Sequence, residues 1–382
     1  MTAPTTTQQP AAAGGAASTW GVSWSGLRTV ATLELRQRVR STRWIVVLVL
    51  WLAALLALTV LLRNTVYDTV TPGAFDGDGN AVSPDVVRQA HQFAGAAVFG
   101  AIVFLVLGLG GLIAPALTAT SINGDRAAGV LAALQTTLLT PAEIALGKLA
   151  AAWGTALAFL AVAAPFLVWA YLDGGTPAGR LLTTLGVLAL TLLVVCAVGL
   201  GWSAVAARTG SSSVLTYLSV VFLGLGLPIV FALSIPVIQQ NDTVQVRQST
   251  EGNDCEVVSS ERIQMHTERT WWLLAANPFV VVADSAPPAR FDGGVGLADP
   301  LTSIRDGVRQ LRLGPPAVVD ECGGFASYGD DERSRQRQAD ALPATWPYGL
   351  AIDLALGVGF TLIAVRRLRA PARTLPRGTR VA

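Results

Sequence analysis

The sequence predicts an all-α polytopic membrane protein with six transmembrane helices. Hydrophobic residues make up 52% of the chain and charged residues only 14%, against about 25% charged residues in soluble domains. Uninterrupted apolar runs of roughly 20 residues, the length at which a helix crosses a bilayer, occur six times in the sequence. None of these runs alternates as a barrel strand does, so each is expected to form a helix.

The six runs divide the chain into membrane and polar segments. The predicted spans are Trp44–Leu62, Phe93–Leu117, Leu149–Leu172, Leu181–Ala206, Val214–Ile238 and Trp346–Val365. Residues 1–18 are expected to be a disordered tail and 19–43 to contain an interfacial helix. The block 44–238 holds the first five spans and a cytoplasmic connector over 119–147. An extracytoplasmic insert over 239–345, the last span over 346–365 and a basic tail over 366–382 follow.

The distribution of charge orients the chain in the membrane. With the N-terminus in the cytoplasm, the inner segments carry 14 cationic and three acidic residues, and the outer segments carry 13 cationic and 21 acidic residues. The positive-inside rule therefore predicts that both termini are cytoplasmic. The single lysine among 27 basic residues, with abundant Ala, Gly and Val, favours a bacterial protein, and hence the bacterial plasma membrane.

The segment before the first span has the pattern of an amphipathic helix. Apolar residues Trp20, Trp24, Leu27, Ala31 and Leu35 recur at steps of three or four, which places them on one helical stripe. Glu34 and Arg38 are spaced to form a favourable pair on that helix. The simpler alternative is a juxtamembrane basic segment held by anionic lipid.

The connector between the second and third spans is more ordered than a simple loop. Asp125 places negative charge in the first turn of a short helix expected over Asp125–Gln135, which Gly129 weakens. Thr140 to Glu143 then forms a capping box with Pro141 at the first helical position. The third helix should therefore begin before its apolar run. The alternatives are a lever between two spans and an ordinary interfacial hairpin.

Taken together, these parts resemble the membrane subunit of type-2 ATP-binding-cassette exporters. The resemblance rests on the basic amphipathic helix, the six-span order with a large outer insert, and the connector. In the connector the matching positions are Asp125 with Arg126, Gly129, the apolar stretch Leu131 to Leu139, Thr140 with Pro141, and Gly147 with Lys148. The family more often has Glu where this chain has Asp125.

The resemblance implies that the amphipathic helix and the connector, as coupling helix, dock on a separate nucleotide-binding subunit. The implied coupling residues are Glu34, Arg38, Asp125, Arg126, Gly129, Glu143 and Lys148. Gly147-Lys148-Leu149 lacks the hydroxyl and the preceding strand of a phosphate-binding loop. ATP and Mg²⁺ are therefore expected on the partner, not on this chain, which is not expected to be an enzyme.

The resemblance also implies that two six-span units, identical or sister subunits, border a route with their second and fifth spans. The candidates on this route are Phe99, Phe104, Thr216, Tyr217, Ser219 and Phe222. Asp353 joins them because an ionisable group within a span is a functional candidate. It either contacts substrate, locks neighbouring spans, or is an inert carboxyl reached by water or a proton. The expected cargo is amphiphilic, drug-like or lipid-linked, and moves outward.

The outer insert holds two of the three cysteines. Cys255 and Cys322 lie on the oxidising side and are expected to form a disulfide, with two free thiols as the alternative. The stretch Trp271–Ala283 is too short to span and contains Asn277-Pro278. It is expected to lie at the outer interface or to re-enter the membrane, anchored by Trp271 and Trp272, with a buried core element of the insert as the alternative.

Other chemistry finds little support in the sequence. Asp76 to Asn80 begins like a calcium loop but has Ala81 and Val87 where that loop needs Gly and Glu. His91 and His266 have no ligand set at zinc spacing. The rival functions are a membrane anchor or sensor with a ligand-binding outer domain, and an intramembrane lipid-modifying enzyme, for which Asp353 alone supplies too few acids.

Overall fold

The computed structural model describes residues 20–70, 83–131, 139–174, 176–249, 255–289, 299–316, 318–322 and 325–368. Within these residues six helical segments are long and apolar enough to cross a membrane, which confirms the predicted class. They are α2 (Thr42–Val70), α3 (Pro84–Thr118), α6 (Pro141–Leu172), α7 (Ala178–Val205), the joined helices α8 (Thr209–Val221), η1 (Phe222–Gly226) and α9 (Leu227–Ile238), and α14 (Trp346–Arg367).

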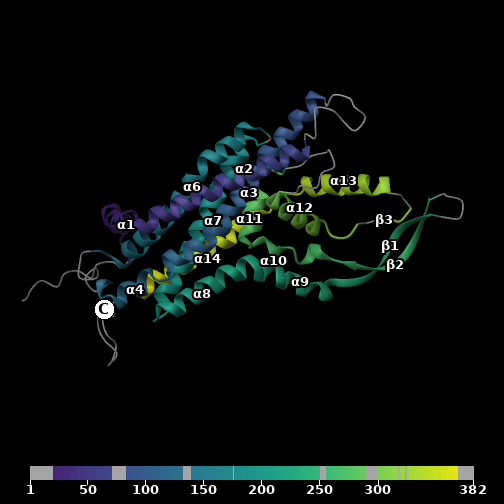
Figure 1. Cartoon of the computed structure of the whole chain (residues 1–382). Helices are drawn as coiled ribbons and strands as arrows, with labels where there is room; N and C mark the ends of the chain where they lie inside the picture. The colour runs from purple at the N-terminus through teal and green to yellow at the C-terminus, as the bar shows by residue number, and fades with distance from the viewer. Residues whose placement is uncertain are drawn as a thin grey trace, which may run out of the picture.

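The polar elements gather at the two ends of an elongated bundle (Figure 1). At one end lie α1 (Trp24–Val39) and α4 (Ser121–Ala127). At the other end lies the insert that joins the fifth and sixth spans. Its elements are β1 (Gln239–Ser249), β2 (Cys255–Met265), η2 (Thr267–Arg269), α10 (Trp272–Ala275), α11 (Pro278–Ser285), α12 (Pro300–Leu313), β3 (Val318–Asp320) and α13 (Phe325–Ala341).

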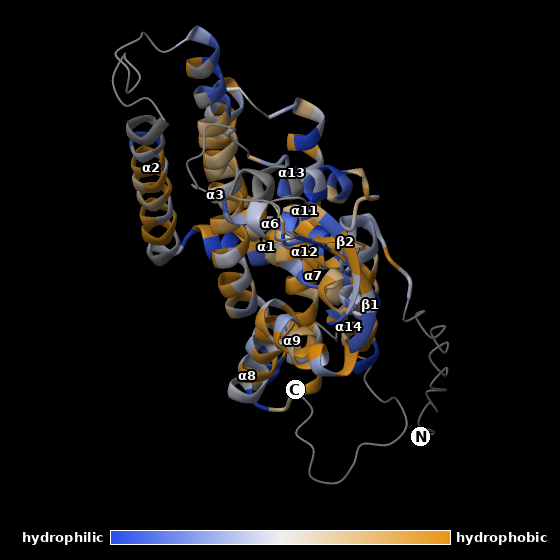
Figure 2. Ribbon diagram, turned by 90° about the vertical axis from the view of Figure 1, so that its right-hand side faces the viewer, coloured by the Kyte–Doolittle hydropathy of each residue, from blue (hydrophilic) through white to orange (hydrophobic). Residues whose placement is uncertain are grey.

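The core lies around α3 and α7. Phe99 and Ile102 of α3 pack with Leu188 and Leu192 of α7, all fully buried. The most apolar windows of α3 and α7 are both 56% buried, whereas that of the fifth span is only 6% buried. The hydrophobic ribbons of α2 and of α8 and α9 lie on different sides of this core (Figure 2). The fifth span therefore presents most of its apolar surface outward.

The insert combines helices with a small sheet that the sequence analysis did not predict. β1 pairs antiparallel with β2 and parallel with β3, in the order β2-β1-β3. Cys255 at the start of β2 and Cys322 just after β3 form the expected disulfide, with Cα atoms 5.8 Å apart. The cross-link ties the hairpin to the segment that leads into α13.

The short apolar stretch is largely buried, against both the insert and the spans α7 and α14. Asn277 caps α11 by accepting a hydrogen bond from the Phe279 N–H at 2.8 Å. Val281, Val282 and Ala283 are fully buried, and α11 packs against α7, α12 and α14. Trp272 remains exposed.

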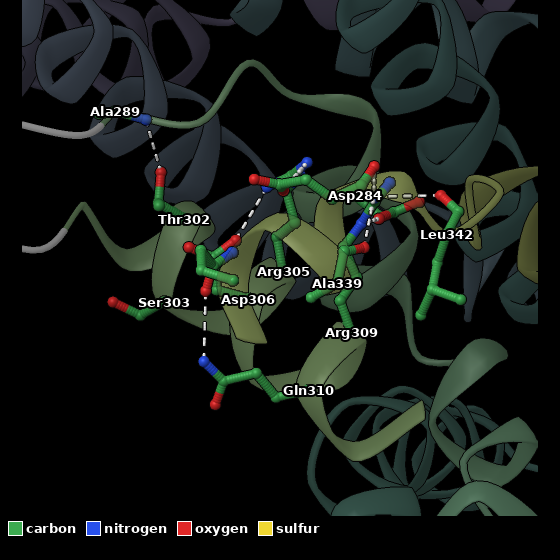
Figure 3. A network of polar contacts seen from close by, with 12 residues as sticks. Asp284, Ala289, Thr302, Ser303, Arg305, Asp306, Arg309, Gln310, Ala339 and Leu342 are labelled. Atoms are coloured by element: carbon green, nitrogen blue, oxygen red, sulfur yellow. Dashed lines mark hydrogen bonds and ion pairs between the residues drawn. The ribbon is translucent and has the colours of Figure 1, made fainter. Parts of the chain in front are cut away.

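A buried carboxylate, Asp284, joins the polar network of the insert (Figure 3) to the start of the last span. Asp284 of α11 accepts a hydrogen bond from Arg309 Nε of α12 at 2.6 Å, and its other oxygen accepts from the Thr345 and Trp346 N–H groups at 2.5 and 3.0 Å. Arg309 also donates to the carbonyl of Ala339. This carboxylate satisfies N–H groups that the start of α14 would otherwise leave unpaired.

Several predicted segments lie outside the described residues. They are the tail 1–18, most of the basic tail 366–382, the incomplete calcium loop over 76–80, and residues 132–138 of the connector.

Candidate functional site

A buried lysine joins three helices at the α1 end of the bundle. Lys148, on the second turn of α6, is 3% exposed. Its ammonium group donates to Glu34 of α1 and forms an ion pair with Asp125 Oδ2 of α4 at 2.5 Å. Both carboxylates are partly exposed, at 22% and 27% of their side chains. Three residues that are far apart in sequence, all expected to take part in coupling, thus form one cluster, here called the Lys148 cluster.

The predicted capping box is present and also binds α1. Thr140 Oγ1 accepts from the Glu143 N–H at 3.2 Å, and Glu143 Oε2 accepts from the Thr140 N–H at 2.8 Å. The other oxygen of Glu143 accepts from the Ser23 N–H at 2.7 Å and from its hydroxyl at 2.6 Å. Thr140 donates to the carbonyl of Gly21. One carboxylate therefore caps α6 and holds the beginning of α1, a role for Ser23 that the sequence pattern did not reveal.

Close helix packing brings α1 against α6. A Cβ atom added at Gly147 would lie 2.6 Å from Val30 Cβ, and one added at Gly26 would lie 2.6 Å from the carboxyl carbon of Glu143. Val30 is buried at this contact, whereas Trp24, which the sequence placed on the same apolar stripe, is exposed. The buried face of α1 is therefore rotated from the predicted stripe, because small side chains, not large ones, allow its approach to α6.

The short helix of the connector is held by the ends of α7 and α8. Ser203 of α7 accepts hydrogen bonds from the N–H groups of Ile122 and Asn123 at 2.9 and 3.2 Å. Ser212 of α8 donates to the carbonyl of Ala119 at 2.6 Å. No sequence pattern distinguishes Ser203 and Ser212, since the backbone groups that they bind are 80 to 93 residues away along the chain.

The connector departs from the expected helix Asp125–Gln135. Helix α4 begins earlier, at Ser121, and ends at Ala127. Gly129 has a φ of +72°, the left-handed conformation that ends helices and favours glycine. Arg126 lies in the last turn of α4, where a cation is favourable. Asp125 is thus near the end of a helix, not at its start, and its charge is balanced by Lys148.

Arg38 lies one helical turn beyond Glu34 on α1. Its guanidinium donates to Thr155 Oγ1 at 3.2 Å and to the carbonyl of Leu117 at 3.3 Å. Burial lowers the pKa of Arg38, and the nearby Glu34 carboxylate opposes this shift. The predicted pair with Glu34 is replaced in the structure by the bond between Glu34 and Lys148.

The candidate route residues lie in different environments. Tyr217 donates to the carbonyl of Leu112 at 3.1 Å, and Ser219 accepts from Trp202 Nε1 at 2.9 Å. Phe222 is half exposed. In contrast, Phe99 and Thr216 are fully buried, and the ring of Phe104 packs against that of Phe279 at 5.4 Å between centroids. Asp353 on α14 is 1% exposed, and neither carboxyl oxygen has a hydrogen-bond partner among the described residues.

The fifth span changes from α-helix to π-helix at η1, within the segment where its glycines and prolines favour irregular backbone. A π-helical turn leaves backbone groups outside the regular pairing and is frequent at functional sites. Asn277 Nδ2 donates to the carbonyl of Gly224 at 2.7 Å and thereby satisfies one such group. The side chain that caps α11 thus also holds the π-helical turn of the fifth span.

His266 lies at the base of the hairpin between two carboxylates. Its Nδ1 is 2.7 Å from Glu268 Oε1 and its Nε2 is 2.6 Å from Asp242 Oδ2. Hydrogen bonds to Glu268 and then Asp242 raise the pKa of this imidazole. Its partners come from two elements, which the sequence spacing did not indicate.

The comparison with protein-family models adds an independent finding. The model described as ABC-2 family transporter protein matches residues 28–282, more than half of the 382 residues. The match begins within α1, includes all three residues of the Lys148 cluster and ends within α11. The comparison with curated proteins found no match.

Proposed function

The chain belongs to the ABC-2 transporter family, and from this membership we propose that it is the permease subunit of an exporter in which the Lys148 cluster transmits movement from the ATPase. Members of this family form the transmembrane part of a transporter that works with an ABC ATPase subunit. ATP and Mg²⁺ then bind to that partner.

The observation that carries the proposal is that one buried cation joins both polar elements to a span. Lys148 binds Glu34 of α1 and Asp125 of α4 at the beginning of α6. A buried ion pair is weak evidence for stability but leaves an uncompensated charge when one partner moves away. A displacement of α4 by the ATPase would therefore be passed to α1 and α6 together.

The beginning of α6 supports this transmission because it is firmly attached. Glu143 holds the first turn of α6 and the start of α1, and Gly147 keeps the two helices in contact. Arg126 and Gly129 lie next to the same region and are proposed to contact the ATPase. Arg38 of α1 is proposed to take part in coupling from the neighbouring helix. The turn at Gly129 leaves a Cβ position open, with no atom within 4 Å.

The second copy or sister permease is proposed to face the fifth span. This span is the least buried of the six, and its exposed apolar side chains recur along one side of α8 and α9. Such a surface must be covered by lipid or protein. With the second span it would border the route of an amphiphilic, drug-like or lipid-linked cargo, with Phe104, Tyr217, Ser219 and Phe222 nearest to it.

The fully buried candidates Phe99, Thr216 and Asp353 need a different role in this mechanism. Each lies inside the unit, so it would reach cargo only after the helices rearrange.

We propose that the protein lies in the bacterial plasma membrane with both termini in the cytoplasm. The arginines beside the ends of two spans, Arg36 and Arg40 before α2 and Arg366 and Arg367 at the end of α14, support this orientation.

The test uses the permease reconstituted in vesicles with its ATPase subunit. Asp125→Asn and Lys148→Met are expected to reduce ATP-dependent cargo accumulation about tenfold, because the first removes the ion pair that ties α4 to α6 and the second leaves two carboxylates without their cation. The matched control is Asp85→Asn at the opposite end of α3, where the carboxylate pairs with Arg88 on the exposed surface and contributes little.

Co-purification with the ATPase separates assembly from transmission. Retained assembly with lost accumulation supports the proposal, and so does loss of both. Full accumulation by both cluster variants would contradict it. A membrane anchor or sensor would accumulate no cargo even as the unaltered protein.

A further inference from the structure

A groove of about 610 Å³ lies beside the Lys148 cluster, between α1, α2, α3 and α6. Its volume is within the range of small-molecule sites, about 300–1,000 Å³. The polar end is formed by Glu34, Gln37, Arg38 and Ser41. The apolar end is formed by Trp44, Val47, Leu112, Ile113 and Phe159. The groove is thus amphipathic along its length.

The polar end holds a cation, Arg38, that has no direct ion-pair partner among the described residues. Among the described residues Arg38 forms hydrogen bonds only to neutral oxygens, those of Thr155 and Leu117, and no carboxylate lies within ion-pair distance. Among the described residues that line the groove, Glu34 alone is a carboxylate; its hydrogen bond is with Lys148, and its charge acts on Arg38 only from a distance. A guanidinium has five N–H donors, so Arg38 keeps donors for an anion. Phosphate is an anion that its fork of donors matches well.

The apolar end needs a cover that water does not provide. Val47 and Leu112 are exposed large hydrophobic residues on facing helices, and Trp44 lies between them and the polar end. Tryptophan is enriched at this depth, where an apolar region meets headgroups. The order from cation to tryptophan to aliphatic side chains matches the order of groups in a membrane lipid.

We propose that this groove binds one glycerophospholipid from the leaflet at the α1 end, with its phosphate on Arg38 and an acyl chain between α2 and α3. A free phosphate would leave the apolar end uncovered. A second copy of the chain is less suited, because the fifth span, which is the least buried of the six, lies on a different side of the bundle from α2 (Figure 2). The proposal does not depend on transport, so its test can fail while the proposed function stands.

A bound lipid would contact the elements that the Lys148 cluster joins. Arg38 is one turn from Glu34 on α1, and Phe159 belongs to α6, the helix of Lys148. The Phe159 ring is also packed edge-on against Trp44 of α2 at 5.1 Å between centroids. Occupancy of the groove would therefore stabilise the position of α1 relative to α2 and α6.

The test is photo-crosslinking of the full-length protein in nanodiscs that contain phosphatidylglycerol with a photoreactive acyl chain. The expected labelled peptides contain Trp44, Val47 or Leu112. Arg38→Gln should lower the labelling of these peptides about tenfold, the loss expected for a hydrogen-bonded charged partner. Ala116→Trp, which fills the exposed side of the groove without changing charge, should lower it similarly.

Two matched variants control for charge and folding. Arg36→Gln removes an exposed cation from the same helix and should label as the unaltered protein does. Arg38→Lys keeps the cation and should retain most of the labelling that Arg38→Gln loses. A photoreactive diacylglycerol, which lacks the phosphate, should label these peptides about tenfold less.

Any of three results would overturn the proposal. These are unchanged labelling in Arg38→Gln, unchanged labelling in Ala116→Trp, and equal labelling by diacylglycerol. Cross-links to a second copy in place of lipid at Trp44 or Leu112 would also overturn it and would assign the groove to a dimer interface.

Discussion

At the scale of single residues, several charged side chains are buried, and their pairing differs from one to the next. Lys148 pairs with two carboxylates, Glu34 and Asp125, and Asp284 pairs with Arg309 and accepts from two backbone N–H groups. Asp299, which caps α12 through Thr302, has one oxygen without a hydrogen-bond partner among the described residues. A buried carboxylate without a cation is costly, because burial disfavours its charged form.

Asp299 should make stability depend on pH. Burial raises its pKa from 3.8 to about 6, against hydrogen bonds from Thr302 that lower it. The folded protein therefore holds a proton between about pH 4 and pH 6 that the unfolded chain has released. This contribution to stability is present below pH 4 and is lost as pH rises through 6.

Asp299→Asn should remove this dependence because an amide oxygen can still accept the Thr302 N–H. At pH 7.5 the variant is expected to be more stable by up to about 3 kcal/mol, and at pH 4 about as stable as the unaltered protein. The measurement is Tm in detergent from pH 4 to pH 7.5. A difference in Tm that does not change with pH would contradict the assignment.

At the scale of elements, the contact between α1 and α6 depends on a small residue. Gly147 has no space for a Cβ, whereas at Gly154, two turns further along α6, a Cβ would meet Leu35 at an ordinary 3.9 Å. Alanine stabilises a helix relative to glycine by roughly 0.5–1 kcal/mol. Alanine should therefore raise helix propensity equally at both positions, whereas only alanine at Gly147 would clash with Val30.

Gly147→Ala should therefore loosen α1, and Gly154→Ala should not. Overpacking costs about 1–3 kcal/mol, so trypsin should cleave α1 at Arg28 or Arg36 about tenfold faster in Gly147→Ala. The rate of appearance of the N-terminal fragment is the measurement. Equal rates in the two variants would show that α1 is not held by this contact.

Among the helices and strands, some were predicted by sequence patterns and others were not. The capping box at Thr140 and the six spans are local patterns, and the structure confirms them. The strands β1 and β2 carry many polar residues and lack a clear apolar face, so periodicity did not identify them. Helix α4 ends at Ala127, before the predicted end of the helix, because the left-handed conformation at Gly129 interrupts it.

At the scale of the whole molecule, the insert is attached to the bundle and cross-linked within itself. Asp284 binds the start of α14, and Cys255–Cys322 closes a loop with a sequence separation of 67 residues. Such a closure contributes about 4 kcal/mol in the chain-entropy model. It requires an oxidising compartment, which agrees with an extracytoplasmic insert.

Thiol counting tests both the disulfide and this location. In denaturant without reductant, a maleimide reagent should label one cysteine of the three, the buried Cys196, and with reductant all three. Replacement of Cys255 and Cys322 by serine should speed proteolysis at Arg247 and Arg262 in the hairpin. Three reactive thiols without reductant would contradict both the disulfide and the proposed orientation.

The sequence by itself determined the properties that depend on composition and local spacing. These are the six apolar runs, the expected orientation from arginine positions, the cap at Thr140 and the family resemblance. Hydrophobic length and capping act over a few turns of helix, so they can be read from neighbouring residues.

Only the tertiary structure decided which residues meet across long separations. Lys148 joins Glu34 to Asp125, Asn277 binds the π-helical turn at Gly224, and Arg38 lies beside an amphipathic groove with no ion-pair partner among the described residues. These contacts depend on how closely the helices approach and on their rotation about their own axes. Both are set by small side chains and by the packing of the whole bundle, which no local pattern contains.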